Sequence, residues 1–402
     1  MRLTSMPTEF SEAIPIIQEL AVAGYEAYFV GGSVRDVLLG KAINDVDIAT
    51  SAYPKEVKSL FKRTVDVGIE HGTVLVLHED QQYEITTFRT ESQYQDFRRP
   101  DKVTFVRSLE EDLKRRDFTI NALAMSEQGQ IIDLFEGLKD IQEKCIRAVG
   151  QPSERFHEDA LRMMRALRFS SQLDFLIEKN TLDAIKEHAA LLQKISVERI
   201  YIELIKMMTS RQWKRGFRSF LETKCYEYCP NFSGRGKQLA CFFQLKEETE
   251  LSEPVFWVLL MHFFTLNAEK ASSFLRDWKL SNHMIRLITH ALAGLEFRLE
   301  NSSNVDFLYQ LGLEPLLVIE EVLALLGKPS SKQKVTDAYQ ALPIHSLQDL
   351  AVNGQAIMRV LDKKPGPWLG DLLKEIEQKV LHKELENSYE KIVNFIQECA
   401  LI

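Results

Sequence analysis

The chain has 402 residues, with 50 Lys and Arg against 58 Asp and Glu, so its formal net charge is −8, and 45% of its residues are hydrophobic. This composition is that of a globular protein, and it excludes collagen-like, coiled-coil and disordered classes. Because a single core rarely grows past ~250 to 300 residues, two or more domains are expected.

Neither a membrane span nor a secretory signal is predicted. The longest apolar run, 255–264, is interrupted by His262, and a helix of that length would rise ~15 Å against a hydrocarbon core of ~30 Å. The first residues lack the apolar segment of a signal peptide. The five cysteines contain no Cys-x-x-Cys pair, which favours reduced thiols over a zinc site or disulfides. We therefore expect a cytoplasmic protein.

The first ~150 residues mix strand and helix patterns. Helical spacing covers 10–23 and 55–61, and Glu127-Gln128-Gly129 separates the two arms of a hairpin. Strands are predicted at 28–30, 45–49, 73–77, 83–88, 124–126 and 130–134. This part should be an α+β head with a small mixed sheet.

After Gly150-Gln151-Pro152, a breaker cluster, the pattern becomes helical throughout. Helices are predicted at 159–169, 182–190, 197–208, 213–222, 254–264, 268–278, 283–298, 305–311 and 369–381, with joints at 230–236, 301–304, 327–331 and 364–366. The fold class is thus an α+β head followed by all-α segments.

Asp45 and Asp47 are two residues apart in a predicted strand, so their carboxylates would point to the same face. Two like charges held close favour a cation between them, and hard oxygen ligands suit Mg²⁺. Alone, the pair also fits a solvated turn. Gly31-Gly32-Ser33 with Arg35 favours a phosphate site nearby, and Glu84 on a later strand could supply a third carboxylate. Together they indicate metal-assisted phosphoryl or nucleotidyl transfer.

Two further groups of residues suit a nucleotide. In Arg115-Arg116-Asp117, with Asn121 four residues on, an arginine can neutralise a triphosphate while Asp117 and Asn121 suit ribose hydroxyls. The alternative is a surface charge cluster.

The predicted helix at 159–169 carries Asp159, Arg162, Arg165 and Arg168 at every third position, on one side. An Asp159 acceptor beside an Arg162 donor would fit the Watson–Crick edges of cytosine and adenine, and not those of uracil and guanine. A solvated, salt-bridged face is the alternative.

These motifs, in this order, resemble those of the class II CCA-adding enzymes and bacterial poly(A) polymerases. They are Gly31-Gly32-Ser33-Val34-Arg35-Asp36, Asp45-Val46-Asp47, Arg115-Arg116-Asp117, Glu158-Asp159-Ala160-Leu161-Arg162 and Ser196-Val197-Glu198-Arg199-Ile200. Segments 347–354 and 364–370 resemble the tail of the short CCA-adding enzymes of Gram-positive bacteria.

The resemblance implies a seahorse-like molecule with a catalytic head (1–150), a neck that reads the base (151–210), a body (211–330) and a tRNA-binding tail (331–402). It also implies residue roles. Asp45 and Asp47 would hold Mg²⁺, with Glu84 as third catalytic carboxylate, either as a metal ligand or as a general base. The nucleotide would be held by Gly32, Arg35, Arg116, Asp117, Asn121, Asp159, Arg162, Arg165 and Arg168.

Full CCA addition is favoured over poly(A) addition for two reasons. Segment 69–74 (Ile-Glu-His-Gly-Thr-Val) resembles the CCA-adding sequence, and 89–99, with Tyr94, Asp96, Arg98 and Arg99, resembles the flexible loop that A-only enzymes lack. The expected substrates are CTP, ATP and tRNA, gripped at its acceptor arm and elbow. Lys206, Arg211, Lys214, Arg215 and Arg218 are candidate phosphate contacts. The alternative functions are a poly(A) polymerase, an A-adding partner enzyme and a non-catalytic tRNA-binding protein. The oligomeric state stays open, with a homodimer as one alternative.

Overall fold

The computed structural model describes residues 1–402 except 44, 96–98, 246–249 and 401–402. The chain divides into two compact units, residues 1–236 with 248–251, and residues 237–247 with 252–402. Within the described residues, none of the helices has the length and apolar character needed to cross a membrane.

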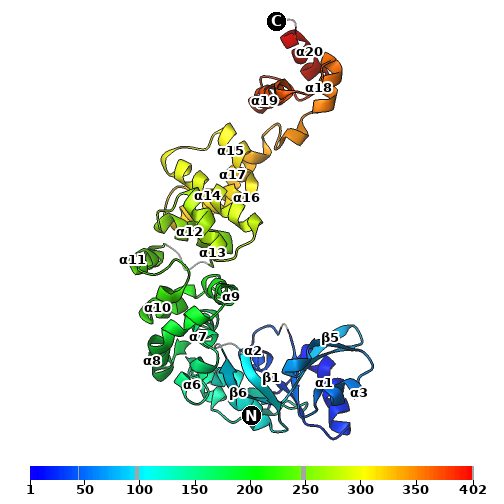
Figure 1. The fold of residues 1–402 in the computed structure, drawn as a ribbon, viewed down its shortest axis with the longest axis vertical. Coiled ribbons are helices and arrows are strands. Elements are labelled where there is room, and N and C mark those ends of the chain that lie inside the picture. The colour runs from blue at the N-terminus through cyan, green and yellow to red at the C-terminus, as the bar shows by residue number, and fades with distance from the viewer. Residues whose placement is uncertain (44, 96–98, 246–249, 401–402) are drawn as a thin grey trace. The chain divides into compact units, whose positions relative to one another are not determined.

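The first unit contains a mixed sheet of seven strands in the order β3-β4-β5-β2-β1-β8-β9, and Figure 1 draws it with β1 and β5 labelled. Its strands are β1 (Ala27–Val30), β2 (Asp47–Thr50), β3 (Thr64–Gly68), β4 (Thr73–His78), β5 (Gln81–Thr87), β8 (Leu123–Met125) and β9 (Ile131–Asp133). β2 and β5 run parallel, and their register pairs Asp47 with Glu84. The predicted strands are confirmed with shifts of a residue or two, whereas β3 was missed.

Alternation along the strands divides the core between the two faces of the sheet. Phe29 packs with helices α1 (Thr8–Val22), α2 (Gly32–Leu38) and α3 (Pro54–Leu60). Val30, the next residue, packs on the other face with Leu113 of helix α4 (Leu109–Lys114). Val30 pairs with Asp47, so Asp47 projects on the α4 side.

The rest of the first unit is helical apart from two short pairs of strands. The helices are α5 (Gly137–Gln142), α6 (Pro152–Glu158), α7 (Leu161–Leu173), α8 (Lys179–His188), α9 (Val197–Met208) and α10 (Trp213–Glu222). β10 (Cys145–Ile146) pairs with β11 (Leu176–Ile177), and β6 (Arg89–Gln95) pairs with β7 (Arg99–Phe105).

The second unit consists of helices. They are α11 (Gly236–Ala240, which begins at the boundary), α12 (Glu253–Phe263), α13 (Ala268–Asp277), α14 (Asn282–Glu300), α15 (Val305–Leu311), α16 (Leu313–Leu325), α17 (Lys332–Gln340), α18 (Gly354–Leu361), α19 (Pro367–Leu381) and α20 (Tyr389–Ala400). The sequence predictions missed α11, α16, α17, α18 and α20. In α16 buried residues occur all round the helix, so no amphipathic period marks it.

Two sequence predictions about carboxylates are wrong in detail. β2 begins at Asp47, so Asp45 lies in the loop before the strand and not on its face. The predicted helix at 159–169 is interrupted at its start, because Asp159 has extended backbone angles between α6 and α7. Its side chain accepts a hydrogen bond from the Leu161 amide at 3.0 Å, and this favours the break.

Candidate nucleotide-binding site

A pocket of about 840 Å³ lies in the first unit between the sheet and helices α7 and α9. It contains every site residue predicted from the sequence except Glu84. Its lining residues are Gly31, Gly32, Arg35, Asp45, Asp47, His71, Arg89, Arg115, Arg116, Asp117, Asn121, Asp159, Leu161, Arg162, Arg165, Arg168, Phe169, Arg199 and Lys206. Lys and Arg side chains clearly outnumber Asp among them, so the pocket suits an anionic ligand although the whole chain is acidic.

The turn at Gly31 brings backbone close to the charged groups of the pocket. Gly31 has φ +75°, and a Cβ built there would lie 3.0 Å from Arg116 Nη1 and 3.8 Å from Asp47 Oδ2. A side chain would therefore strain the backbone and displace the arginine. The glycine that the sequence reading placed beside a phosphate site is required here by conformation and by space.

Asp47 and Asp45 form the acidic corner of the pocket. Protein atoms around Asp47 partly desolvate its carboxylate and raise its pKa; Arg116 lowers the pKa, while Glu84 and Asp45 raise it further. The charge of Arg116 therefore does not fully offset the desolvation of Asp47 and the neighbouring acids. Asp45 and Asp47 thus fit a divalent cation by charge and by ligand chemistry.

Glu84 lies beside this corner rather than in it. It is the register partner of Asp47 on β5 and has an exposed side chain, but it is not among the residues that line the pocket. Over the described residues, no set of three or more His, Cys, Asp or Glu is arranged to hold a metal ion. Glu84 as third catalytic carboxylate therefore remains a prediction.

A chain of hydrogen bonds joins the head to helix α7 through Asp117. Arg35 Nη1 donates to Asn121 Oδ1 at 2.6 Å, and Asn121 Nδ2 donates to Asp117 Oδ1 at 3.0 Å. Arg165 donates to the other oxygen of Asp117 from Nε at 2.8 Å. Burial raises the pKa of Asp117, but Arg165, Asn121 and Arg162 outweigh it and hold the pKa well below its usual range. The predicted proximity of Asp117 and Asn121 is confirmed, across a 3-10 turn (Thr119–Asn121) rather than an α-helix.

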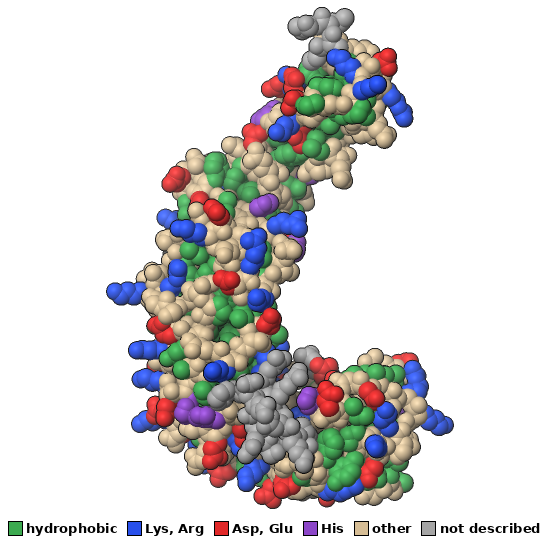
Figure 2. Space-filling model, in the orientation of Figure 1, with side chains coloured by type: hydrophobic (Ala, Val, Ile, Leu, Met, Phe, Trp, Pro, Cys, Tyr) green, Lys and Arg blue, Asp and Glu red, His purple; other side chains and the backbone are tan. Residues whose placement is uncertain are grey.

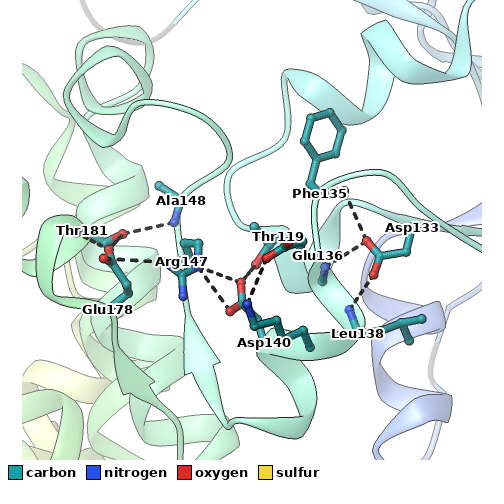
Figure 3. Close-up of polar contacts among 12 residues, drawn as sticks. Thr119, Asp133, Phe135, Glu136, Leu138, Asp140, Arg147, Ala148, Glu178 and Thr181 are labelled. Atoms are coloured by element: carbon teal, nitrogen blue, oxygen red, sulfur yellow. Dashed lines mark hydrogen bonds and ion pairs between the residues drawn. The ribbon is translucent and has the colours of Figure 1, made fainter.

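A buried carboxylate behind that turn holds it in place, as Figure 3 shows. Asp140 of α5 accepts from Thr119 Oγ1 at 2.6 Å and from Arg147 Nε at 3.2 Å. Arg147 also pairs with Glu178, whose other oxygen accepts from Thr181. The network connects the turn that carries Asn121 to α5 and α8 (Figure 3).

A second buried carboxylate, Asp112 of α4, fixes the two arginines of the Arg-Arg-Asp motif. Its Oδ1 accepts from Arg115 at 2.8 Å and its Oδ2 accepts from Arg116 at 3.2 Å. It also accepts from the Arg89 amide at the start of β6, at 3.4 Å. Asp112 was not predicted from the sequence, and it is not among the residues that line the pocket.

The two residues predicted to read the base already have protein partners. Asp159 Oδ2 accepts from Arg199 Nη2 at 2.6 Å. Arg162 donates from Nη1 to Glu158 at 2.6 Å and from Nη2 to the carbonyl of Arg115 at 2.9 Å. These hydrogen bonds fix both side chains in orientation. Because each carboxylate oxygen has two lone pairs and a guanidinium has five N–H groups, both side chains can also bind a ligand.

Several residues of this site were not assigned to it from the sequence, among them Phe169, Arg199 and Glu203. Phe169 lines the pocket next to Arg168, and Arg199 holds Asp159. Glu203 of α9 is buried and accepts from Arg168 Nε at 2.5 Å. Glu203 falls in the apolar stripe of Ile200, Leu204 and Met207. A carboxylate in such a stripe is the signal that could have indicated a buried ion pair.

The predicted loop at 89–99 contains strand β6 and the first residue of β7, and these two strands form an antiparallel pair. Asp96 and Arg98 lie outside the described residues, and the side chains of Tyr94 and Arg99 are not described either. Arg89 lines the pocket and donates to the carbonyl of His71.

The predicted tRNA contacts have varied surroundings. Lys206 lines the pocket, Arg215 Nε lies 2.6 Å from Asp174, and Lys214 lies over the Trp213 ring. On the face drawn in Figure 2, Lys and Arg side chains stand beside acidic ones over the helices. The basic side chains on this face are thus interspersed with acidic ones (Figure 2).

Three family models match successive parts of the chain. They are the poly A polymerase head domain over residues 27–147, the probable RNA and SrmB-binding site of polymerase A over 174–233, and the putative tRNA nucleotidyltransferase domain 2 over 247–396. A CCA-adding enzyme of Enterococcus faecalis is 55% identical over 398 residues, covering 99% of this chain and 98% of the relative. The chain belongs to the CCA-adding enzyme family.

Other CCA-adding enzymes agree with this assignment. One from Ligilactobacillus salivarius is 47% identical and covers 98% of this chain and 97% of its own length. The crystal structure of the Bacillus stearothermophilus CCA-adding enzyme in complex with CTP matches with a TM-score of 0.88 and 42% identity over 98% of each chain. The Thermotoga maritima CCA-adding enzyme complexed with tRNA has a TM-score of 0.64 at 22% identity, covers 97% of this chain and 94% of its own, and shares the fold.

The family and the fold class expected from the sequence are thus confirmed, and the chain is an enzyme of the nucleotidyltransferase class. Enzymes of this family generally depend on a metal ion.

Proposed function

We propose that the chain adds and repairs the 3′-terminal CCA of tRNA, using CTP and ATP without a nucleic-acid template and releasing pyrophosphate. The observation that carries this proposal is a single basic pocket in which the carboxylate pair, the Arg-Arg-Asp motif and the arginines of α7 meet. One site would serve both nucleotides.

The predicted roles follow the arrangement of the pocket. Arg35 and Arg116 bind the triphosphate near the backbone of Gly32, and Asp117 with Asn121 holds the ribose. Asp45 and Asp47 hold a divalent ion, proposed as Mg²⁺. That ion would lower the pKa of the tRNA 3′ hydroxyl and balance charge on the departing pyrophosphate. Glu84, one strand away, adds negative charge beside the pair.

The base is read by hydrogen bonds from the protein. Asp159 accepts from the exocyclic amine of cytosine or adenine, and Arg162 donates to the adjacent ring nitrogen. Uracil and guanine present the reverse order at these positions and are rejected. Contacts of Asp159 with Arg199 and of Arg162 with Glu158 support this role by fixing both side chains before a nucleotide binds. Arg165 and Arg168 complete the pocket.

The proposed function extends to tRNA binding and to location in the cell. We propose the division into head (1–150), neck (151–210), body (211–330) and tail (331–402), with the helical parts gripping the acceptor arm and elbow by shape and phosphate contacts. Affinity for tRNA should then fall steeply with salt, because phosphate binding releases counterions. We further propose that the enzyme works in the cytoplasm.

One assay tests the function. tRNA lacking its CCA is incubated with labelled CTP, then with ATP, and the product is sequenced. Two C and one A, followed by a stop, are expected. Repeated A addition would indicate a poly(A) polymerase, refusal of CTP an A-adding enzyme, and no incorporation a binding protein.

Two substitutions test the residue roles. Asp45→Ala should abolish incorporation of both nucleotides with an unchanged circular dichroism spectrum. The matched control is Asp66→Ala, which removes an exposed carboxylate of β3 that pairs with Lys58 of α3. This variant should retain activity. Arg162→Ala should weaken discrimination against UTP more than triphosphate binding. Normal C addition by Asp45→Ala would contradict the metal assignment.

A further inference from the structure

Phe169 is one of the residues that line the basic pocket, and it is 3% exposed. Three guanidinium groups lie over its ring. The Cζ atom of Arg168 is 4.0 Å from the ring centroid, that of Arg35 is 5.1 Å away and that of Arg165 is 5.3 Å away. All three distances are within the ~6 Å over which a cation is attracted to the face of an aromatic ring.

The three cations come from different elements and have different anionic partners. Arg35 is on α2 and pairs with Asp36 at 2.8 Å, whereas Arg165 and Arg168 are on α7. Arg165 pairs with Asp117 at 2.6 Å, and Arg168 pairs with Glu203. Each ion pair neutralises one guanidinium. The Phe169 ring is a contact that all three share.

We propose that Phe169 is a positioning residue that gathers the three arginines around the triphosphate of the incoming nucleotide. This inference rests on the proposed function. Three like charges repel one another, and an acidic residue at their centre could hold them together. A further carboxylate at this position would, however, add to the negative charge of Asp117, which already lines the pocket, and would repel the triphosphate. The negative face of a neutral ring attracts the guanidinium groups without adding formal charge.

The position of Phe169 predicts which kinetic constants depend on it. The triphosphate is common to CTP and ATP, so loss of the ring's attraction should weaken both nucleotides alike. Asp159 and Arg162, which are proposed to read the base, have partners of their own. Discrimination against UTP should therefore stay unchanged, and kcat should change much less than KM.

The test varies the electrostatics of the ring at nearly constant size. Phe169 is replaced in the full chain by mono-, di- and trifluorophenylalanine, which weaken the negative ring face stepwise, and by leucine. KM for CTP and ATP should rise with each fluorine, to about 10-fold for the trifluoro ring, since attraction by a desolvated ring amounts to about 1 to 2 kcal/mol. The thermal midpoint of the fluorinated series should fall by no more than about 2 to 8 °C, because the ring keeps its shape and loses only its attraction to the cations.

The same series at Phe29 is the matched control. Phe29 is also buried, and its ring packs against Phe10 in the core under α1. Fluorination there should leave KM unchanged. The proposal is overturned if KM is flat across the Phe169 series, if only one nucleotide is affected, or if the Phe29 series shows the same rise.

A binding measurement separates this proposal from the proposed function. Inorganic tripolyphosphate is titrated into wild type, the Phe169 fluorinated series and Phe169→Leu by calorimetry. The dissociation constant should rise by about 10-fold for the trifluoro ring and for leucine, in line with KM. If the wild type adds no nucleotide, the proposed function fails, and a flat tripolyphosphate series independently overturns the role of the ring.

Discussion

Gly216 sets how closely helices α7 and α10 approach, and its replacement by alanine should disturb the nucleotide site from behind. It is the fourth residue of α10. A Cβ built there would lie 2.2 Å from the Leu167 carbonyl oxygen and 2.3 Å from Ser171 Oγ. Both atoms belong to α7, and one of them is backbone. Gly216→Ala therefore requires the two helices to move apart.

The magnitude follows from two opposing effects. Alanine is favoured over glycine inside a helix by about 1 kcal/mol. Overpacking a tight contact costs about 1 to 3 kcal/mol, and a contact with backbone should fall at the upper end. The net loss of unfolding free energy should be about 2 kcal/mol. Gly370 is the matched control, because it is also the fourth residue of its helix, α19, and none of the described atoms beyond its neighbours lies within 4 Å of the place that a Cβ would occupy. Gly370→Ala should stabilise its unit by about 1 kcal/mol.

Thermal unfolding combined with hydrogen exchange distinguishes the two units. A loss of about 2 kcal/mol should lower the midpoint of the first unit by about 4 to 8 °C, and amides of α7 should exchange faster. Because α7 carries Arg162, Arg165 and Arg168, KM for both nucleotides should also rise. An increase in the midpoint of Gly216→Ala matching that of Gly370→Ala would refute the reasoning.

The buried carboxylates give three further predictions. Asp112→Ala leaves Arg115 and Arg116 without their shared partner and should lower the unfolding free energy of the first unit by about 3 to 5 kcal/mol, measured in denaturant. Burial raises the pKa of Asp112, but the two arginines outweigh it and lower the pKa; the carboxylate therefore stabilises the fold above about pH 4 and loses this effect as pH falls further. Acid titration of Asp112→Asn should accordingly show a shallower loss of stability than wild type, and an identical profile would count against the ion pairs. Asp140→Asn should cost about 1 to 3 kcal/mol and raise KM for CTP and ATP severalfold, because Thr119 then holds the turn at Asn121 less firmly; unchanged KM in a destabilised variant would restrict Asp140 to the fold.

The sequence predicted well those features that depend on local pattern. Runs of apolar, β-branched and aromatic residues, a turn signal at 127–129 and one two-residue alternation at 45–49 located most strands of the sheet. The order of short motifs identified residues that meet in one pocket. Errors arose where an acidic residue stands just outside an element. Asp45 precedes β2 and Asp159 precedes α7. A carboxylate just before an element is favourable because it can accept hydrogen bonds from free backbone amides or from solvent. Asp159 before an apolar helical run is a typical helix-start signal, so this break was predictable.

The groups behind the pocket could not be predicted in the same way, because their role depends on tertiary contact alone. Glu203 is 35 residues from Arg168, and no spacing rule connects residues that far apart in sequence. The net charge of −8 was a poor guide to the ligand because it sums over the whole chain and does not show where basic side chains gather. Asp112 fixes Arg115 and Glu203 fixes Arg168, and neither carboxylate is among the residues that line the pocket. Phe169, a neutral ring, does line it. Part of the charge of the arginines is thus compensated by carboxylates outside the lining, and the lining keeps the excess of basic side chains that a triphosphate requires.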